Sequence, residues 1–549
     1  MTIREARLIK IALILTLLTY LAGAGNLIQE VDPAQYAEIA REMVESHDWL
    51  VLHDNYGPYL DKPPITFWII GSSYKIFGVN NFAYRLPTIL FAILSILILG
   101  RIALILYNHE TAWLAMLILS SSEAYSLMVA DPKIDMFLVG FLIAAFWAYF
   151  ESKTRPAMMY LFYLFCGLAV MTKGPIGLMI PAAAIGAELL LCRDWKGIRK
   201  LKPIAGLIIL ALAIAPWYLV LGQETGGSGP YFMLFEQSFG RILVRNFTNN
   251  FGPFYFSGTF LWTFLPWSLA VLFLIAARLR AFWKRPDKFE FQPRRILVWW
   301  FLIPFLFISA ASYKLPQYLF WLLPPLAILL ADFLIEISQE PQIKWLKHLV
   351  RTQVICAFAV ILAMLAAATV CFPVHGIVAW MLILAGLAGF LGLMFLPAGP
   401  IKNLAILPAS AMILFNLIFS LHIYSETLKY QYADQAAKII RQQDPSGPVV
   451  YVYKLKAAKA LAFYSGRKVE IVHLDQLKNM AGERKKILVL VKEPRLRAVR
   501  RFLGRGFRIH RLGRFDEYHT SVPTAKFLYY KTRPSTLQGL LLLEISTGA

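Results

Sequence analysis

Carboxylates and lysines recur in the short polar segments between the apolar runs of this sequence. Asp32 follows the first apolar run, the pair Asp61-Lys62 precedes two prolines, and Asp135 opens a later run. A carboxylate can accept a proton or stabilise a positive charge, and an ammonium group can bind a phosphate. Because charge beside a lipid bilayer is costly and usually serves function, these segments are the candidates for a reactive site.

Each of these residues also has a structural interpretation. Asp32 could cap a helix, with Pro33 at the first helical position and Gln35 completing a capping box. The pair Asp61-Lys62 could be an exposed ion pair that contributes less than about 1 kcal/mol. Asp135 could be an acid favoured at a helix start. The spacing leaves both interpretations of these residues open.

Two later lysines and one long loop add cations. Lys173 lies in a tight turn between two apolar runs, and Lys314 lies in a similar turn further on. Either side chain could instead extend to water from the end of its span. The segment 223–257 begins with a glycine-rich stretch and carries Glu236, Arg241 and Arg245 at spacings that nearly share a helix face. A mobile loop with two arginines would suit a lid over an anionic ligand.

The elements that would position these residues are membrane-spanning helices. The chain has 549 residues, 58% hydrophobic and 16% charged, and a soluble protein of this size has too little interior for that composition. Apolar runs of about 17–25 residues, each long enough to cross a bilayer, recur as far as residue 424. We predict a polytopic α-helical membrane protein with about thirteen spans. They lie near 8–28, 86–107, 111–129, 135–151, 157–172, 176–192, 203–222, 258–277, 295–312, 318–337, 350–372, 376–396 and 401–424.

The formal net charge of +22 lies mostly in short loops between apolar runs. The basic clusters at 196–202, 278–295 and 344–351 fall on the side of the N-terminus, and such clusters hold loops in the cytoplasm. We therefore expect no nucleic-acid partner. The segments 29–85 and 223–257 and the C-terminal residues would then face the periplasm from a bacterial inner membrane.

Two regions depart from the spanning pattern. Residues 33–46 and 64–78 are predicted to be amphipathic helices in the membrane interface, the first with its glutamates on the polar face. Beyond residue 424, β-rich runs at 448–455, 468–474, 485–491, 507–512 and 526–530 alternate with helical stretches and predict a small α/β domain. We divide the chain into a transmembrane domain, 1–424, and a periplasmic domain, 425–549. The segment 534–549 has no pattern that we can assign.

Few charges lie inside the predicted spans: Arg101, Glu123, Glu188 and Asp332, most of them toward span ends. A transporter or lipid flippase would need ionisable groups near the bilayer midplane and two related halves, and neither is evident. A non-catalytic scaffold would not need ordered charged motifs. The four cysteines lie in or beside apolar runs without metal-type spacing, so we expect neither disulfides nor a thiolate metal site. An enzyme fits best, with a flippase or transporter as the alternative from another class.

Six motifs follow one another along the chain. They are Asp-Pro-x-x-Tyr-x-x-Ile-x-Arg-Glu-Met at 32–43, His-Asp-Trp-Leu-Val-Leu-His at 47–53, Asp-Lys-Pro-Pro at 61–64, Thr-Lys-Gly-Pro at 172–175, the aromatic and charged stretch from Tyr231 to Arg241, and Lys-Leu-Pro-x-Tyr at 314–318. As a set they resemble the aminoarabinose transferases and the related protein O-mannosyltransferases. These families belong to the GT-C superfamily of lipid-linked sugar transferases, and the spans and C-terminal domain fit the same resemblance.

The resemblance implies an inverting glycosyltransferase that takes its sugar from undecaprenyl phosphate. The acceptor would be lipid A or another glycolipid, as in transfer of 4-amino-4-deoxy-L-arabinose. Asp32 would be the main catalytic carboxylate and Asp135 the second acid of the site. Lys62 would hold the carrier phosphate with help from the two loop arginines. The full set expected to bind carrier phosphate or substrate is Tyr59, Asp61, Lys62, Lys173, Glu236, Arg241, Arg245, Lys314 and Tyr318.

Two positions depart from the family pattern. Asp61 stands where the family often has glutamate, and Asn249-Asn250 stand where it often has histidine. The family associates these positions with a metal, so we predict no metal site and no cofactor beyond the lipid-linked donor. The departures leave the sugar and the acceptor open, with a protein O-mannosyltransferase-like enzyme as the alternative. We expect a monomer whose partners are membrane lipids, the polyprenyl-phosphate carrier and the acceptor.

Overall fold

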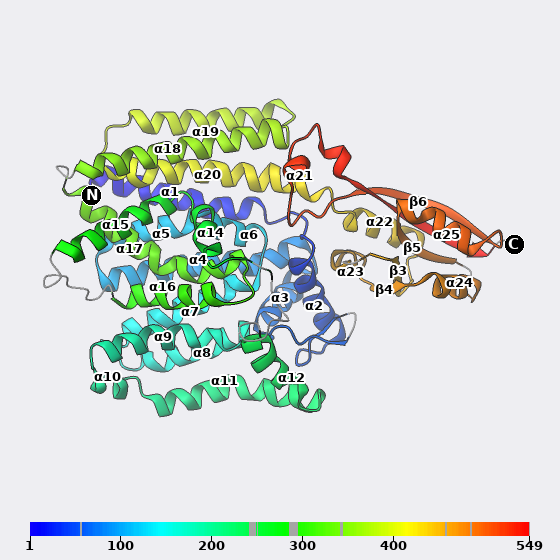
Figure 1. Ribbon diagram of the computed structural model, residues 1–549, viewed down its shortest axis with the longest axis horizontal. Coiled ribbons are helices and arrows are strands. Elements are labelled where there is room, and N and C mark those ends of the chain that lie inside the picture. The colour runs from blue at the N-terminus through cyan, green and yellow to red at the C-terminus, as the bar shows by residue number, and fades with distance from the viewer. Residues whose placement is uncertain are drawn as a thin grey trace.

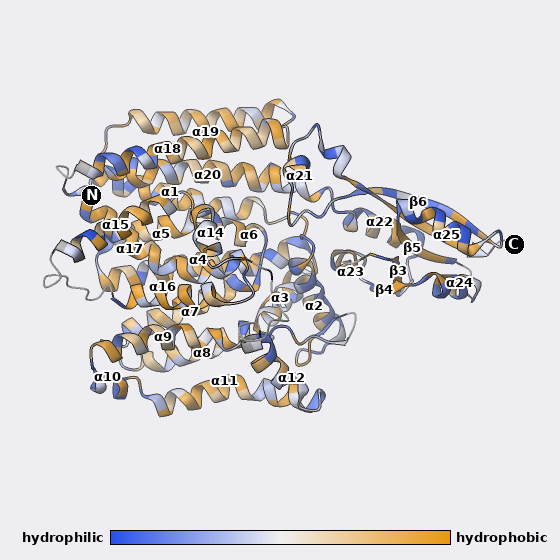
Figure 2. Ribbon diagram, in the orientation of Figure 1, coloured by the Kyte–Doolittle hydropathy of each residue, from blue (hydrophilic) through white to orange (hydrophobic). Residues whose placement is uncertain are grey.

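The molecule is an elongated helical bundle with a small sheet domain at one end of its long axis (Figure 1). A computed structural model describes residues 1–54, 57–240, 249, 251–284, 295–340, 344–455, 458–483 and 486–547. Figure 2 shows that the bundle is mostly hydrophobic, whereas the small domain mixes hydrophobic and hydrophilic residues. This contrast agrees with a helical membrane domain that carries a water-exposed domain.

The helices of the bundle follow one another along the chain with short connections. They are α1 (Ile3–Ala22), α4 (Asn81–Leu106), α5 (His109–Ser120), α6 (Glu123–Ala130), α7 (Ile134–Glu151), α8 (Met158–Lys173), α9 (Ile176–Leu191), α10 (Trp195–Lys200), α11 (Pro203–Glu224), α12 (Ser228–Tyr231), η1 (Phe232–Gly240), α14 (Tyr255–Thr263), α15 (Ser268–Lys284), α16 (Arg295–Ala310), η3 (Pro316–Leu322), α17 (Leu323–Ser338), α18 (Lys344–Ala366), η4 (Ala367–Cys371), α19 (Ile377–Phe395), η5 (Lys402–Ile406), α20 (Leu407–Ile418), η6 (Phe419–Ile423) and α21 (Tyr424–Leu428).

Within the described residues, 7 helices are long and apolar enough to cross a membrane, or up to 9 if each bent pair counts as one span. The two bent pairs are α5 with α6, which turn by 55°, and α14 with α15, which turn by 120°. The remaining predicted spans coincide with α1 and with three shorter apolar helices, α8, α9 and α16. The prediction of a polytopic helical membrane protein is confirmed, and each predicted span corresponds to a helix or a bent pair.

The two ends of the bundle differ in what they carry. The N-terminus and α10, which holds the first predicted basic cluster, lie at the end of the bundle away from the sheet domain (Figure 1). Helices α2 (Asp32–Ser46) and α3 (Ile65–Phe77) lie at the opposite end, between the bundle and the sheet domain (Figure 1). A two-stranded ribbon, β1 (His53–Asp54) with β2 (Gly57–Pro58), joins these two helices.

The first amphipathic helix is as predicted, but its polar face is only partly exposed. Tyr36, Ile39 and Met43 are buried, as the pattern required. Glu38 is also buried, with Arg41 donating to it over 2.7 Å. The reason is that α2 packs on both α3 and the sheet domain's α23 (Lys459–Ser465), so that part of its polar face is covered as well. The expectation that its glutamates face water is therefore wrong for Glu38.

The sheet domain has five strands in the order β4-β3-β5-β7-β6. Its elements are α22 (Ala433–Gln443), β3 (Val449–Tyr453), α23, β4 (Lys468–Val472), α24 (Leu474–Glu483), β5 (Lys486–Lys492), η7 (Glu493–Arg495), α25 (Leu496–Leu503), β6 (Phe507–Glu517), α26 (Ala525–Leu528), η8 (Arg533–Thr536) and β7 (Gln538–Thr547). Strand β3 runs parallel to β4 and β5, and β7 pairs antiparallel with β5 and β6. The small α/β domain and four of its predicted strands are confirmed.

The fifth predicted strand, at 526–530, is wrong. These residues form α26 and the turn after it, because the Thr524 hydroxyl caps the helix by accepting the Phe527 N–H. Phe527 is buried, stacked on Tyr518 with ring centroids 3.8 Å apart. The strand that completes the sheet is β7, in the segment that had no assigned pattern. Its leucines are buried on both faces of the sheet, so no alternation marks it as a strand.

Arg533 ties this last segment to the bundle. Its buried guanidinium donates to the carbonyls of Phe527 and Leu528, at 2.9 and 3.1 Å, and to that of Cys371 at the end of η4. It also lies 4.0 Å from the ring centroid of Phe372. We predict that Arg533→Leu destabilises the protein by about 3 kcal/mol, because buried carbonyls lose charged donors. A lower melting midpoint of Arg533→Leu in a thermal-shift assay would show this loss of stability.

The neighbouring exposed Lys531→Leu is the control for that variant and should leave the melting curve unchanged. Superposable melting curves for Arg533→Leu and the wild type would contradict this role of Arg533.

Candidate active site

A polar cavity at the sheet-domain end of the bundle brings most of the predicted site residues together. It is open to solvent and has a volume of about 660 Å³. Its walls come from α2, the segment before α3, the start of α7, the end of α8 and η3. The lining residues are Asp32, Gln35, Tyr36, Tyr59, Asp61, Lys62, Lys133, Ile134, Asp135, Lys173, Tyr313, Leu315, Gln317 and Tyr318.

Asp32 is exposed in this cavity and does not cap its helix. It is the first residue of α2, and the cap position is Val31, which has no side-chain acceptor. Gln35 does not close a capping box, since its amide donates to Asp54 over 3.5 Å. The capping interpretation is wrong. A carboxylate in the first helical turn interacts favourably with the helix dipole.

Tyr36 lies one turn after Asp32 and lines the same cavity. Burial raises the pKa of its hydroxyl well above the usual value, and the nearby Tyr59, Asp32 and Asp135 raise it further. The hydroxyl therefore keeps its proton and can donate a hydrogen bond into the cavity.

Asp135 is buried at the start of α7 and is held by two donors. Lys173 Nζ lies 2.5 Å from Asp135 Oδ1, and Trp321 Nε1 donates to the same oxygen over 2.8 Å. The ammonium group of Lys173 also lies 5.0 Å and 4.9 Å from the ring centroids of Tyr318 and Trp321. Lys173 can sit at the very end of α8 because Gly174, with φ of +81°, turns the chain sharply after it. The result is a buried ion pair set in an aromatic wall.

Asp61 and Lys62 form the exposed rim of the cavity. Gln237 Nε2 donates to Asp61 Oδ1 over 2.6 Å, which links the segment before α3 to η1. Lys62 Nζ donates to the Asp61 carbonyl over 3.0 Å. Lys62 and Lys173 both line the cavity.

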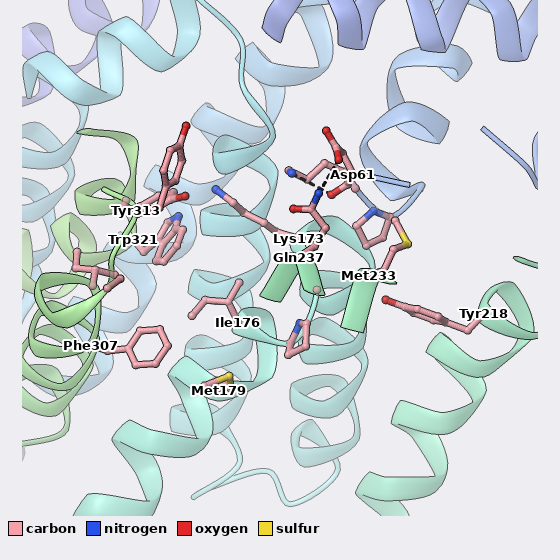
Figure 3. A pocket seen from close by; sticks show the side chains of 17 residues that line it. Asp61, Lys173, Ile176, Met179, Tyr218, Met233, Gln237, Phe307, Tyr313 and Trp321 are labelled. Atoms are coloured by element: carbon pink, nitrogen blue, oxygen red, sulfur yellow. Dashed lines mark hydrogen bonds between the residues drawn. The ribbon is translucent and has the colours of Figure 1, made fainter. Parts of the chain in front are cut away.

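An apolar cavity of about 890 Å³ opens beside the polar one and shares part of its wall. The shared residues are Asp61, Lys62, Lys173, Tyr313 and Tyr318. Figure 3 shows Lys173 extended toward Tyr313 and Trp321, Asp61 and Gln237 on the other side, and Ile176, Met179 and Phe307 at the far end. The cavity therefore runs from a charged end to an apolar end.

A third cavity meets the polar one on its other side, through Lys133 and Gln317. Its walls are largely apolar, and part of them comes from the segment Thr520–Pro523 of the sheet domain. The apolar lining residues include Leu127, Met128, Trp262, Phe320, Phe372, Phe419, Ile423 and Leu528. The polar cavity with its three carboxylates thus adjoins two amphipathic cavities.

Not every predicted residue lies at this site. Lys314 is buried but donates to the Ala311 carbonyl over 2.6 Å, and it lines neither of the two cavities that Tyr313 lines. Glu236 is exposed on η1, and its neighbour Gln237 faces the cavity instead. Arg241 and Arg245 lie outside the described residues, so the lid over an anionic ligand stays a prediction.

Sequence reasoning missed several lining residues. Lys133 lies in the same stretch as Asp135, and Trp321 follows Tyr318 by one turn, so that proximity to a predicted residue was the available signal. Gln237 and Tyr313 adjoin the predicted Glu236 and Lys314, but a one-residue shift along a turn decides which side chain faces a cavity.

Two residues at the start of α4 hold the segments that carry the carboxylates. Tyr84 donates to the Pro132 carbonyl over 3.1 Å. Arg85, only 1% exposed, donates to the Ala130 carbonyl over 3.2 Å, to the Leu27 carbonyl over 2.6 Å and to the Asn26 carbonyl. The guanidinium therefore fixes the end of the segment before Asp32 to the end of α6, just before Asp135. A lone arginine at the edge of a predicted span could not reveal this.

The positions that the family associates with a metal are engaged otherwise. Asp61 accepts from Gln237, and the Asn249 amide accepts the Lys314 N–H over 3.1 Å and donates to the Lys314 carbonyl. Asn250 lies outside the described residues. Across the residues that the structure describes, no group of three or more His, Cys, Asp or Glu side chains lies close enough to hold a metal ion.

The chain is similar in sequence to known lipid-linked sugar transferases. Residues 61–219 match the family model described as dolichyl-phosphate-mannose-protein mannosyltransferase. The chain is 31% identical over 347 residues to undecaprenyl phosphate-alpha-4-amino-4-deoxy-L-arabinose arabinosyl transferase 2 of Proteus mirabilis, covering 60% of each protein. It is 29% identical over 362 residues to the corresponding transferase of an Enterobacter species, covering 64% of this chain and 63% of that protein. The aligned regions thus span less than two thirds of these relatives' own lengths.

The fold matches over nearly the whole chain. ArnT from Cupriavidus metallidurans bound to undecaprenyl phosphate superposes with a TM-score of 0.77, covering 98% of this chain and 97% of that one at 19% identity. The same protein in the apo state gives a TM-score of 0.75. The chain therefore has the ArnT fold, and the resemblance to GT-C polyprenyl-phosphate sugar transferases that the motifs indicated is confirmed.

The ion pair of Lys173 and Asp135 yields a prediction about stability. Each of the variants Lys173→Met and Asp135→Asn leaves its partner buried without its opposite charge, which costs about 3–5 kcal/mol. The double variant removes both charges, so we expect it to lower the melting midpoint less than the sum of the two single losses. Thermal-shift measurements on the wild type, the two single variants and the double variant together form a double-mutant cycle.

Lys468→Met breaks the exposed pair of Lys468 and Glu470, 3.5 Å apart, and is the control with no expected effect. If the double variant lowered the melting midpoint by the sum of the two single losses, Lys173 and Asp135 would not be coupled. The interpretation of Asp135 as the partner of a buried ion pair would then be wrong.

Proposed function

We propose that this chain is an inverting glycosyltransferase that transfers a sugar from a polyprenyl-phosphate donor to a lipid acceptor. The observation that carries the proposal is the meeting of two amphipathic cavities at a polar cavity that holds three carboxylates and three lysines. A reaction between two lipids needs one apolar cavity for each chain and a polar meeting point for the headgroups. The names of the similar transferases, which act on undecaprenyl phosphate-linked aminoarabinose, support the same reaction.

The donor fits the cavity in Figure 3. Lys62 and Lys173 lie at its charged end, where they would bind the carrier phosphate, and the apolar end is suited to the first isoprene units. When the bond from the anomeric carbon to the phosphate oxygen breaks, negative charge grows on the leaving phosphate. The two ammonium groups would stabilise that charge. Arg241 and Arg245 would add to them from the loop.

Asp32 is suited to the chemical step because it lines the cavity, is exposed there and makes no cap bond to its helix. It would take the proton of the acceptor hydroxyl or phosphate as the acceptor oxygen attacks the anomeric carbon. Attack from the side opposite the leaving phosphate in a single displacement inverts the configuration. Asp135, paired with Lys173, would hold the cation in place and contribute negative charge beside the positive sugar.

The acceptor would occupy the third cavity. Its apolar walls suit acyl chains, and Lys133 lies where it opens into the polar cavity. This favours a glycolipid such as lipid A over an extended peptide. A protein acceptor remains the second candidate, because residues 61–219 match the protein mannosyltransferase model.

The same arguments support an arrangement in the membrane. We infer thirteen spans, with the N-terminus and the basic α10 in the cytoplasm and the polar cavity and sheet domain on the periplasmic side of a bacterial inner membrane. The cavity with Asp32, Lys62 and Asp135 at one end of the bundle favours an enzyme over a transporter, which would need access from both ends.

The role of Asp32 can be tested directly. Asp32→Asn keeps the shape of the side chain but cannot accept the proton, so we expect sugar transfer to fall by about a hundredfold or more. The assay would follow transfer from a panel of polyprenyl-phosphate sugars to lipid A and to peptide acceptors. The matched control is Asp475→Asn, which changes another exposed first-turn acid, on α24 of the sheet domain. Equal transfer by wild type and Asp32→Asn would remove Asp32 from the mechanism.

The donor cavity can be tested by a substitution at its apolar end. Met179→Gln places an amide in the apolar end and should raise KM for long-chain donors by about tenfold, since an unpaired polar group there costs about 1–3 kcal/mol. Donors with only one or two prenyl units do not reach that end, so their KM should not change. Met381→Gln, at an exposed position on α19, is the control. Equal changes for long and short donors would place the prenyl chain elsewhere.

A further inference from the structure

The segment that leads from α1 to Asp32 is held from outside by the sheet domain. The Ile28 N–H donates to the Tyr464 hydroxyl over 2.7 Å, and the Ile28 carbonyl accepts from Gln431 over 3.0 Å. The backbone of Glu30 makes two more such bonds. Its N–H donates to Gln431 Oε1 over 2.6 Å, and its carbonyl accepts from the Ser521 hydroxyl over 2.6 Å. All three partners come from beyond α21, in the C-terminal part of the chain.

The side chain of Glu30 makes two further bonds to the sheet domain. One carboxylate oxygen accepts the Lys459 N–H over 3.0 Å, and the other accepts the Ala460 N–H over 2.8 Å. Two consecutive backbone N–H groups at the start of α23 thus bind both oxygens of one carboxylate. Such bonds to a charged acceptor are among the stronger hydrogen bonds in proteins.

This link is continuous with the wall of the candidate active site. The first turn of α2 is built on the same segment, since the N–H groups of Ala34 and Gln35 donate to the carbonyls of Gln29 and Val31 at 3.1 and 3.0 Å. Asp54 makes a second connection between α23 and α2. It lies 3.3 Å from the ammonium group of Lys459, and it accepts a hydrogen bond from the Gln35 amide. A shift of α23 would therefore move both the start of α2 and the side chain at Gln35.

We propose that Glu30 is a positioning residue through which the sheet domain sets the location of Asp32. The sheet domain is then a working part of the catalytic site, although it supplies none of the fourteen residues that line the polar cavity. The proposal rests on the proposed function, in which Asp32 is the carboxylate that takes the acceptor proton.

The charge state of Glu30 gives the link a signature that a merely structural contact lacks. Burial raises the pKa of Glu30 to about 7, partly offset by the two N–H bonds and by Lys459, and Glu517 raises it further. The other titratable groups that line the adjoining cavity are Tyr432, Lys492, Tyr518 and His519. Both oxygens accept from N–H donors, so the ionised form makes the tighter link. As the pH falls through about 7, protonation puts a hydrogen on one of these oxygens and weakens it.

The experiment compares wild type with Glu30→Gln in the full-length protein. The amide nitrogen of glutamine meets a backbone N–H, so one of the two bonds is lost. We expect kcat for sugar transfer to fall by about tenfold with KM little changed, since Asp32 is displaced while the donor cavity is not. We also expect the fall in kcat on the acid side of pH 7 to disappear and the exchange of amide hydrogens in residues 26–36 to quicken.

Two further variants complete the design. Glu470→Gln, at a half-exposed position on β4 that faces Lys468, is the control and should change none of these quantities. Ser521→Ala removes only the hydroxyl bond to the Glu30 carbonyl, and it carries the test if Glu30→Gln fails to fold. It should produce the same changes in kcat and in hydrogen exchange, at smaller size.

The outcomes separate the proposal from the function on which it rests. Glu30→Gln with the kcat, pH profile and exchange rates of the wild type would overturn the positioning role. Unchanged exchange in residues 26–36 of a folded Ser521→Ala protein would overturn it as well. If the wild type transfers no sugar to any acceptor, the proposed function fails, and the hydrogen exchange of residues 26–36 still decides whether Glu30 holds the segment.

Discussion

Arg85 lies buried where two segments of the chain, each leading to a carboxylate, come together. A guanidinium is never neutral in proteins, and once it is buried its N–H groups must all find acceptors. Here the acceptors are main-chain carbonyls at the end of α6 and in the segment after α1. Because these carbonyls belong to the backbone, the interaction fixes the relative positions of two chain segments rather than the position of one side chain. Asp32 and Asp135 line a common cavity, and the backbones before them are joined in this way.

Around this fixed point the site is built in layers. The buried pair of Lys173 and Asp135 forms the inner layer, and Trp321 holds Asp135 from the side. Asp32 and Lys62 form the outer layer, open to solvent and to the two amphipathic cavities. Charges in the inner layer act through a medium of low dielectric, where they stabilise developing charge more strongly than in water. A donor that separates into a negative phosphate and a positive sugar is stabilised when both cations and carboxylates lie close to the breaking bond.

The comparison between sequence and structure separates two kinds of inference. The apolar runs located nearly every helix of the bundle, because a chain in lipid must satisfy its backbone within each span. Four strands of the sheet domain followed from short β-rich runs separated by helical stretches. The pattern failed at β7, whose residues are buried on both faces, and at 526–530, where a threonine cap and an aromatic cluster around Phe527 made a helix. In both places the decisive contacts come from elsewhere in the chain.

The sequence by itself determined the membrane class, the small C-terminal domain and the residue types of the site, since hydropathy and charge are local properties. It also identified seven residues that line the polar cavity, among them Asp32, Asp135 and Lys173. Only the tertiary structure decided that Lys173 pairs with Asp135, that Gln237 rather than Glu236 faces the cavity, and that Lys314 turns away from it. It alone revealed the positioning roles of Arg85 and Glu30. Their partners are backbone groups of distant segments, and a sequence carries no record of which backbone groups will meet a given side chain.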